Sequence, residues 1–171
     1  MSSASGQRPL RMRANRHLGA ALVDASLLKL EHLEAANERF LELAATDNPR
    51  QTTLLGILAY EHKVLREEDV LQHAVDEHGI GLVDLREYDL AEEIKSVLDL
   101  DVCWATWSLP FDREEDFHFV ATASYLSPAV RSLWEKRLGG PVIWYGTTLE
   151  MIADALEKIA ADRERLPPRA T

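Results

Sequence analysis

The sequence of 171 residues has a single cysteine, few aromatic residues and no long apolar run. Because Cys103 stands alone, no disulfide can form within the chain, and a reducing compartment fits the sequence. No apolar segment approaches the roughly 18 residues that a membrane-spanning helix requires. The first residues also lack the apolar core of a signal peptide. We therefore expect a soluble, cytoplasmic protein that does not insert into the membrane.

Basic residues are in the minority. The chain has 19 Lys and Arg against 29 Asp and Glu, a net charge of −10. A chain of this charge repels phosphate backbones and anionic membrane surfaces. The sequence therefore predicts no nucleic-acid partner.

The common signatures of catalytic and nucleotide-binding sites are also missing. The chain has no Gly-x-x-x-x-Gly-Lys-Ser/Thr loop, no Gly-x-Gly-x-x-Gly and no Gly-x-Ser-x-Gly. None of the six histidines has a spacing typical of metal ligands. Cys103 would need a nearby histidine to act as a nucleophile, and a buried, inert thiol is the simpler interpretation. We expect no enzymatic activity, no metal and no cofactor.

What the sequence does contain is a degenerate internal repeat. Leu18-Gly19 begins the first copy and Leu55-Gly56 begins the second, an offset of 37 positions (56 − 19) at which Leu28 also matches Leu65. A fixed internal period indicates one supersecondary unit that is used more than once. Two copies are too few for a solenoid, so we interpret the repeat as a helix pair duplicated inside one domain.

Apolar spacing predicts four helices in the first half of the chain. These helices cover residues 17–25, 29–45, 53–61 and 67–78. Pro49 separates the two pairs, and Gly79 is expected to end the fourth helix. Residues 1–15 are rich in Ser, Gly, Pro and Arg and show no apolar periodicity, which predicts a flexible tail. The alternative is an arm that reaches a phosphate ligand or an acidic partner.

In the second half of the chain the residue pattern predicts strands interleaved with helices. The expected strands are residues 81–85, 102–109, 117–123 and 141–145. The expected helices are residues 91–98, 128–138 and a last one that begins near residue 147. Ser127 is a candidate N-cap, and Thr147 with Glu150 is a candidate capping box. All four tryptophans lie in this half, where we expect core packing, with one exposed tryptophan at a partner surface as the alternative.

These elements predict an α+β fold. A four-helix subdomain over residues 16–80, made of two repeated helix pairs, would pack on a small mixed α/β subdomain over residues 81–162. Residues 163–171 would form a C-terminal tail.

The repeated Leu-Gly-x-x-Leu, each followed by a turn and a second helix, resembles the MshEN-type N-terminal domain of type II secretion and type IV pilus assembly ATPases. Residues 79–85, Gly-Ile-Gly-Leu-Val-Asp-Leu, are similar to the family's junction between its last repeat helix and a Leu-Pro-Phe-Val-Asp-Leu-like strand. The resemblance covers residues 17–159. It implies a module that docks on the cytoplasmic part of a membrane platform and that, in some members, binds cyclic di-GMP through the two repeats. Since the chain stops where the family's ATPase would begin, we expect a standalone module without motor activity.

The family's ligand motif runs Arg-Leu-Gly-x-x-Leu, then Gly, three Leu and a closing Gln. The matching residues are Leu18, Gly19, Leu22, Leu28, Leu33, Leu55, Gly56 and Leu65. The departures are His17 and Leu54 for arginine, Ser26 and Lys63 for glycine, Asn37, Ala59, Val70 and Ala74 for leucine, and Phe40 and Glu77 for glutamine. Losing two arginine–phosphate contacts is expected to weaken binding about a hundredfold or more. Arg16, one position early, is a candidate replacement.

The sequence therefore predicts a non-enzymatic interaction or regulatory module. It would dock a protein partner of a membrane-associated secretion, pilus or exopolysaccharide apparatus, through apolar surface on the helical half or through an exposed tryptophan. The alternative is a cyclic di-GMP receptor that binds through Arg16 and the matching residues of the two repeats.

Overall fold

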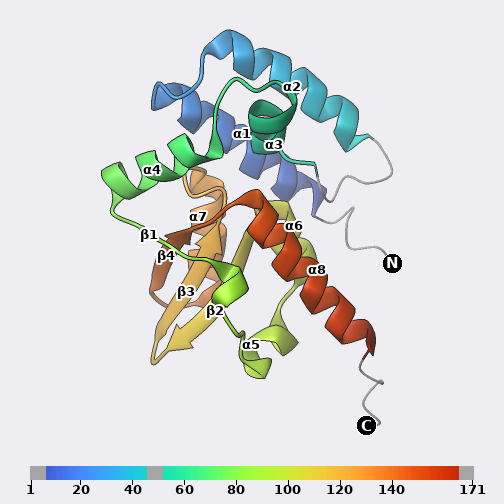
Figure 1. Cartoon of the computed structure of the whole chain (residues 1–171), viewed down its shortest axis with the longest axis vertical. Helices are drawn as coiled ribbons and strands as arrows, with labels where there is room; N and C mark the ends of the chain where they lie inside the picture. Colours follow the sequence, from blue (N-terminus) through green and yellow to red (C-terminus); the bar gives the residue numbers. More distant parts are fainter. Residues whose placement is uncertain (1–6, 46–51, 166–171) are drawn as a thin grey trace.

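The computed structural model describes residues 7–45 and 52–165, in which a layer of helices lies across one end of a small sheet (Figure 1). In chain order the elements are α1 (Arg8–Asp24), α2 (Leu30–Ala44), α3 (Leu54–Gly56), η2 (Ile57–Glu61), α4 (Glu67–His78), β1 (Gly81–Leu82), η3 (Leu85–Glu87), α5 (Glu92–Val97), α6 (Leu100–Thr106), β2 (Ser108–Glu114), β3 (Phe117–Thr122), α7 (Pro128–Leu138), β4 (Val142–Gly146) and α8 (Leu149–Arg165). The turn η2 is a π-helix and η3 is a 3-10 helix. The predicted α+β fold is confirmed.

The sheet has the strand order β1-β4-β3-β2. β2 and β3 form an antiparallel hairpin, whereas β4 is parallel to both β3 and β1. The chain crosses from β3 to β4 through α7, because parallel neighbours cannot be joined by a tight turn. The register pairs Phe119 with Ile143, which decides which side chains share a face of the sheet.

The duplicated helix pair is visible in the backbone. Ser26 and Lys63, 37 positions apart (63 − 26), both have a positive φ, of 61° and 55°. The helices that follow these turns begin at Leu30 and Glu67, again 37 positions apart (67 − 30). The predicted repeat of a helix, a turn and a helix is therefore confirmed at the level of dihedral angles.

The expected tail over residues 1–15 is wrong from Arg8 onward, because α1 begins there. Leu10, Ala14 and Leu18 follow one another at intervals of four and are all buried, where α1 packs on α6 and α7. The arginines between them hide this spacing in the sequence. Residues 1–6, 46–51 and 166–171 lie outside the described residues, and so does the predicted stop at Pro49. The last helix also runs past the expected boundary at residue 162.

The expected strand over residues 102–109 is also wrong. These residues belong to α6 and to the first part of β2. Asp99 caps the helix, its Oδ1 accepting from the backbone N–H groups of Asp101 (3.1 Å) and Val102 (3.4 Å). Residues 102–111 are all buried, so no amphipathic periodicity distinguishes a helix from a strand.

The expected capping box and the exposed tryptophan are corrected as well. Ser127 is the N-cap residue of α7, as predicted, but its Oγ donates to the carbonyl oxygen of Ala14 in α1 (2.8 Å) and makes no capping hydrogen bond. At α8, Thr148 Oγ1 accepts from the N–H of Met151 (3.2 Å), in place of a box between Thr147 and Glu150. All four tryptophans are at most 8% exposed. An exposed tryptophan is therefore not available for docking.

Candidate functional site

The leucines of the two repeats lie in the core. Leu18, Leu22, Leu28 and Leu55 are at most 6% exposed, and Leu54, at the second arginine position of the motif, is 0% exposed. Leu33 and Leu65 are partly buried and pack against the same core. The structure thus brings the predicted ligand-contacting leucines together as packing between helices.

The two repeat glycines allow close contact between helices. A Cβ atom added at Gly19 would lie 2.6 Å from Leu33 Cδ1 and 3.0 Å from Leu54 Cδ2. At Gly56 the nearest atom, Thr53 Cγ2, would lie at 3.0 Å. Because Cβ atoms in proteins rarely lie this close to another atom, Gly19 in particular is needed for the approach of α2 and α3 to α1.

The turns that follow the first helix of each copy carry Ser26 and Lys63 at the glycine positions of the motif. A non-glycine residue in this left-handed region costs about 1–2 kcal/mol. A hollow of about 390 Å³ lies at the first turn. Its lining includes Ser26, Lys29 and His32 from the first copy and Val64 from the second, so the two turns meet there.

The side chains of Arg16 and His17 lie in different surroundings. Arg16 is exposed, whereas His17 lines an open groove of about 640 Å³ between α1 and α7. Among the described residues that line this groove, the charged or titratable ones are Arg13, His17, Lys136 and Arg137. All four are basic, in a chain whose net charge is −10. We call this feature the basic groove.

A buried carboxylate joins the repeats to the second half of the chain. Glu67, 3% exposed, accepts through Oε1 from the N–H of Leu149 at the start of α8 (2.9 Å). Its other oxygen accepts from the hydroxyl of Tyr60 in η2, and this hydrogen bond is the main cause that raises the pKa of Tyr60. The sequence gives no sign of this link between Glu67 and Leu149, since an acid in the first turn of a helix indicates only an interaction with the helix dipole.

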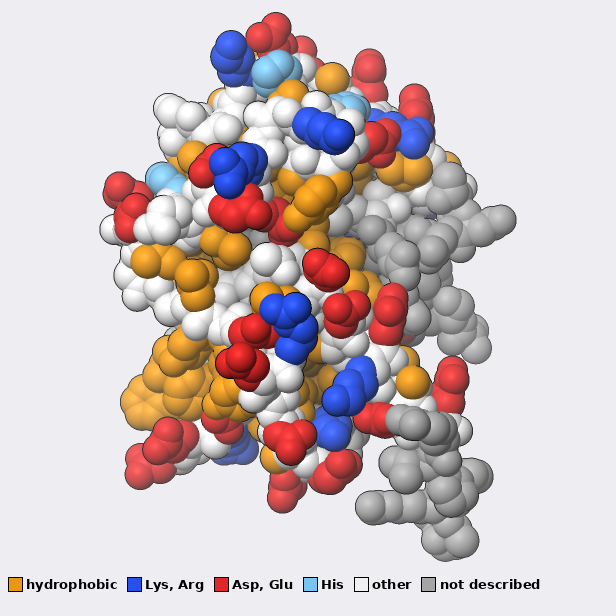
Figure 2. All heavy atoms as spheres, in the orientation of Figure 1, with side chains coloured by type: hydrophobic (Ala, Val, Ile, Leu, Met, Phe, Trp, Pro, Cys, Tyr) orange, Lys and Arg blue, Asp and Glu red, His pale blue; other side chains and the backbone are white. Residues whose placement is uncertain are grey.

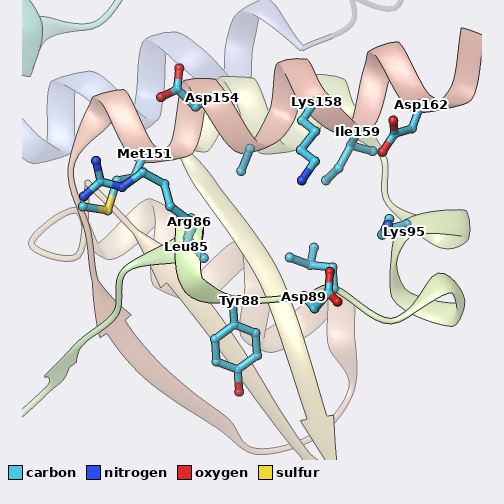
Figure 3. A pocket seen from close by; sticks show the side chains of 12 residues that line it. Leu85, Arg86, Tyr88, Asp89, Lys95, Met151, Asp154, Lys158, Ile159 and Asp162 are labelled. Atoms are coloured by element: carbon cyan, nitrogen blue, oxygen red, sulfur yellow. The ribbon is translucent and has the colours of Figure 1, made fainter.

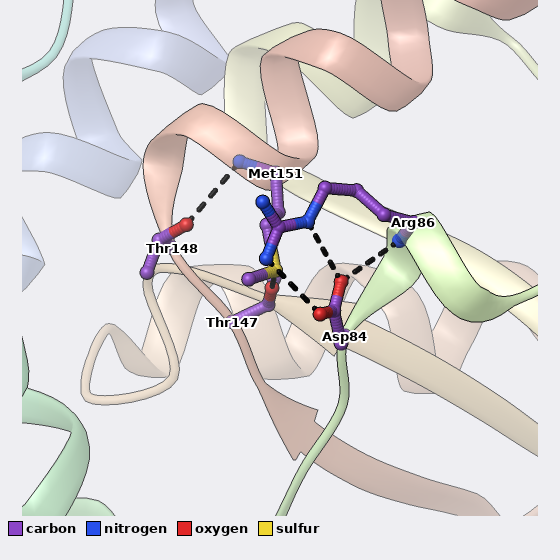
Figure 4. Close-up of polar contacts among 5 residues, drawn as sticks. All are labelled: Asp84, Arg86, Thr147, Thr148 and Met151. Carbon is purple, nitrogen blue, oxygen red and sulfur yellow. Dashed lines mark hydrogen bonds and ion pairs between the residues drawn. The ribbon is translucent and has the colours of Figure 1, made fainter.

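The Val-Asp-Leu segment turns the chain from the sheet edge toward α8 (Figure 4). Asp84 Oδ1 accepts from the backbone N–H (3.0 Å) and Nε (3.0 Å) of Arg86, and Asp84 Oδ2 accepts from Nη2 (3.1 Å). These hydrogen bonds hold the pKa of the Asp84 carboxyl below its usual value. Asp84 therefore acts in this structure as the cap of η3.

A cleft of about 200 Å³ separates α8 from the segment that contains η3 (Figure 3). Each wall carries both signs of charge. The η3 side contributes Arg86, Asp89 and Lys95, and α8 contributes Asp154, Lys158 and Asp162. Since cations and anions alternate, the cleft does not select a ligand of one charge.

Chemistry at Cys103 is disfavoured by its burial. The thiol is 0% exposed inside α6, and desolvation raises its pKa to about 12, so it stays protonated at neutral pH. Within residues 7–45 and 52–165, no group of three or more His, Cys, Asp or Glu is placed to hold a metal ion. None of the helices in the same ranges is both long and apolar enough to cross a membrane.

Residues 78–166 match the MshEN domain family model. The chain is 30% identical over 114 residues to the type IV pilus assembly ATPase PilB of Thermus thermophilus, an alignment that covers 67% of this chain and 12% of that protein. Two solved structures share the fold. The N-terminal domain of XpsE has a TM-score of 0.54 at 18% identity, covering 85% of this chain and 94% of that one. MshE, solved with cyclic di-GMP, has a TM-score of 0.51 at 15% identity, covering 83% and 97%.

Proposed function

This chain belongs to the MshEN domain family, and we propose that it is a non-enzymatic docking module that binds a protein of a secretion, pilus or exopolysaccharide apparatus. MshEN is the N-terminal domain of secretion and pilus ATPases. The chain matches only 12% of the length of PilB, so the ATPase activity of that protein is not carried over.

The observation that carries the proposal is the burial of the repeat residues. Leu54, at the second arginine position of the motif, is 0% exposed, and His17 faces α7 in the basic groove. A dianionic dinucleotide requires exposed, charge-assisted donors, which these two positions do not supply to the repeat layer. The shared architecture without those donors supports a role in which the domain presents its surface to another protein.

The test measures direct binding to membrane-platform proteins. The chain is immobilised, and the purified cytoplasmic domains of the platform proteins from the same organism are passed over it in biolayer interferometry. We expect one of them to bind with a micromolar or tighter Kd, while an unrelated domain of similar net charge does not bind. If none of them binds, the docking proposal is wrong.

Cyclic di-GMP binding is the second candidate, and two observations favour it. MshE was solved with cyclic di-GMP, and it shares this fold over 97% of its chain. The basic groove offers three cationic side chains, Arg13, Lys136 and Arg137, beside His17 at the first arginine position of the motif. When the free ligand concentration is 100 times Kd, binding raises a receptor's free energy of unfolding by about 2.7 kcal/mol. In a domain of this size that gain raises Tm by about 5–10 °C. Arg13→Ala should abolish this shift if the groove is the site.

A further inference from the structure

One face of the sheet carries a set of exposed and half-buried apolar side chains on β3, β4 and the segment after η3. Alternation along β3 places Phe117 and Phe119 on the same face. The pairing of Phe119 with Ile143 places Ile143 and Tyr145 of β4 on that face too. Tyr88, which follows η3, lies against the same aromatic cluster. We call Tyr88, Phe117, Phe119, Ile143 and Tyr145 the aromatic patch.

Three members of the patch reach solvent. Phe117 is 43% exposed, Tyr88 40% and Ile143 38%. Phe111 lies beneath the patch, with ring centroids 4.8 Å from Tyr88, 5.5 Å from Tyr145 and 6.4 Å from Phe119. Figure 2 shows hydrophobic side chains gathered at the lower left, where Figure 1 places β3 and β4. Aromatic side chains held in place by packing, yet open to solvent, are typical of interfaces.

The described residues of the helical half do not offer a comparable surface. Tyr60 on η2 is 61% exposed, but its hydroxyl donates to Glu67. The exposed leucines are Leu30 at 59% and Leu41 at 56%. These two lie about 16 Å apart along α2, because each residue adds about 1.5 Å. Singly exposed leucines are ordinary on a protein surface. The expectation of docking through the helical half therefore has less support than the sheet face.

Acidic side chains border the aromatic patch. In the β2–β3 ladder Glu114 is the partner of Phe117, and Asp112 is the partner of Phe119. Asp112 accepts from the Tyr88 hydroxyl (2.7 Å), while Glu115 and Asp116 form the turn. In Figure 2 acidic side chains lie along the lower edge of the hydrophobic area. The field at this edge favours a cationic partner.

We propose that the aromatic patch binds a protein segment with an apolar centre flanked by Lys or Arg residues. This inference rests on the proposed docking function and gives that function a surface. A second copy of the chain is disfavoured, because a two-fold contact would bring two acidic borders together. An anionic membrane surface is disfavoured by the same charges and by the net charge of −10.

Selection from a random peptide display library tests the proposal with the intact chain as bait. Enriched peptides are synthesised, and their Kd values are measured by fluorescence anisotropy. We expect peptides with aromatic or aliphatic centres between basic residues. Phe117→Ser should raise the Kd of these peptides about tenfold or more, and Glu114→Lys should raise it about two- to fivefold. Leu41→Ser, at a residue that is 56% exposed on α2, is the control and should leave Kd unchanged.

Circular dichroism and Tm establish that each variant is folded before Kd is compared. Enriched peptides that lack basic flanks, or that bind Phe117→Ser as well as the original chain, would overturn the inference, and so would a selection that enriches nothing. These outcomes leave the docking proposal standing if a platform domain still binds in interferometry. Platform binding that Phe117→Ser does not weaken would place docking on another surface.

Discussion

The two copies of the repeat have the same backbone plan but different surroundings. In the first copy α1 is a continuous helix of 17 residues that packs on α6 and α7. In the second, three α-helical residues lead into the π turn η2, and α4 packs on β4. Leu30 and Glu67 occupy equivalent positions, yet Leu30 is 59% exposed and Glu67 only 3%. Duplication thus preserved the turn and the helix start, while the neighbours decide what each side chain does.

The second copy also has a wider turn. In the first, the N–H of Leu27 reaches the carbonyl of Leu22 (3.0 Å), whereas the N–H of Val64 reaches that of Leu58 (2.9 Å), one residue further back. π turns inside helices often occur at functional positions. Here the wide turn carries Tyr60, which contacts Glu67.

The largest difference between the copies should appear at Leu30 and Glu67. Glu67→Ala leaves the Leu149 N–H without its acceptor and should lower the free energy of unfolding by about 3 kcal/mol. Leu30→Ala should change it by less than about 0.5 kcal/mol. Urea denaturation measures both. Equal losses would mean that Glu67 does not join the repeats to α8.

A smaller effect is expected where the first copy supports the second. Asn15 Oδ1 accepts from the N–H of Leu54 at the start of α3 (2.9 Å), and Asn15 Nδ2 donates to the carbonyl of Arg11 (2.8 Å). Asn15→Ala should cost about 1–2 kcal/mol and speed hydrogen exchange at the Leu54 amide. The amide of His17, the equivalent of Leu54 inside α1, serves as the control. Unchanged exchange at Leu54 would show that Asn15 does not cap α3.

Substitution by alanine should lower the stability of the protein at Gly19 but not at Gly56. At Gly19 the added Cβ overpacks against Leu33 and Leu54, which outweighs the better helix propensity of alanine and should cost about 1 kcal/mol. Gly56→Ala should be close to neutral, because only one side-chain atom is tight. Thermal unfolding should show Tm about 2–4 °C lower for the Gly19 variant alone. A matching fall in Tm at Gly56 would contradict the contrast in packing.

The smallest effects should be alike in the two copies. Ser26→Gly and Lys63→Gly place glycine at a positive φ and should each raise the free energy of unfolding by up to about 1 kcal/mol. Chemical denaturation of both variants measures this gain. Destabilisation at either turn would show that the side chain there makes contacts that outweigh the backbone strain.

The sequence predicts best what depends on local chemistry. The Leu-Gly offset located the turn in each copy but not its left-handed conformation, because a turn and its flanking helices are short-range features. The start of α1 was hidden by arginines between Leu10, Ala14 and Leu18. α6 was mistaken for a strand, because a helix buried on all sides has no periodic polar face.

Long-range features of the candidate sites could not be predicted in the same way. Glu67 and Leu149 are 82 residues apart in sequence, and only the folded chain brings them together. The exposure of Phe117 and Ile143 depends on which face of the sheet the helices leave open. The sequence pattern identifies β3 and β4 as strands but not what covers them.

Calorimetric titration of the chain with cyclic di-GMP, beside an Arg16→Ala variant, separates the two proposed functions most directly. A docking module whose repeat leucines are core should give no heat of binding up to about 300 µM nucleotide. Micromolar or tighter binding would contradict this result and make the chain a nucleotide receptor. Weaker binding by Arg16→Ala would then identify Arg16 as the replacement phosphate contact.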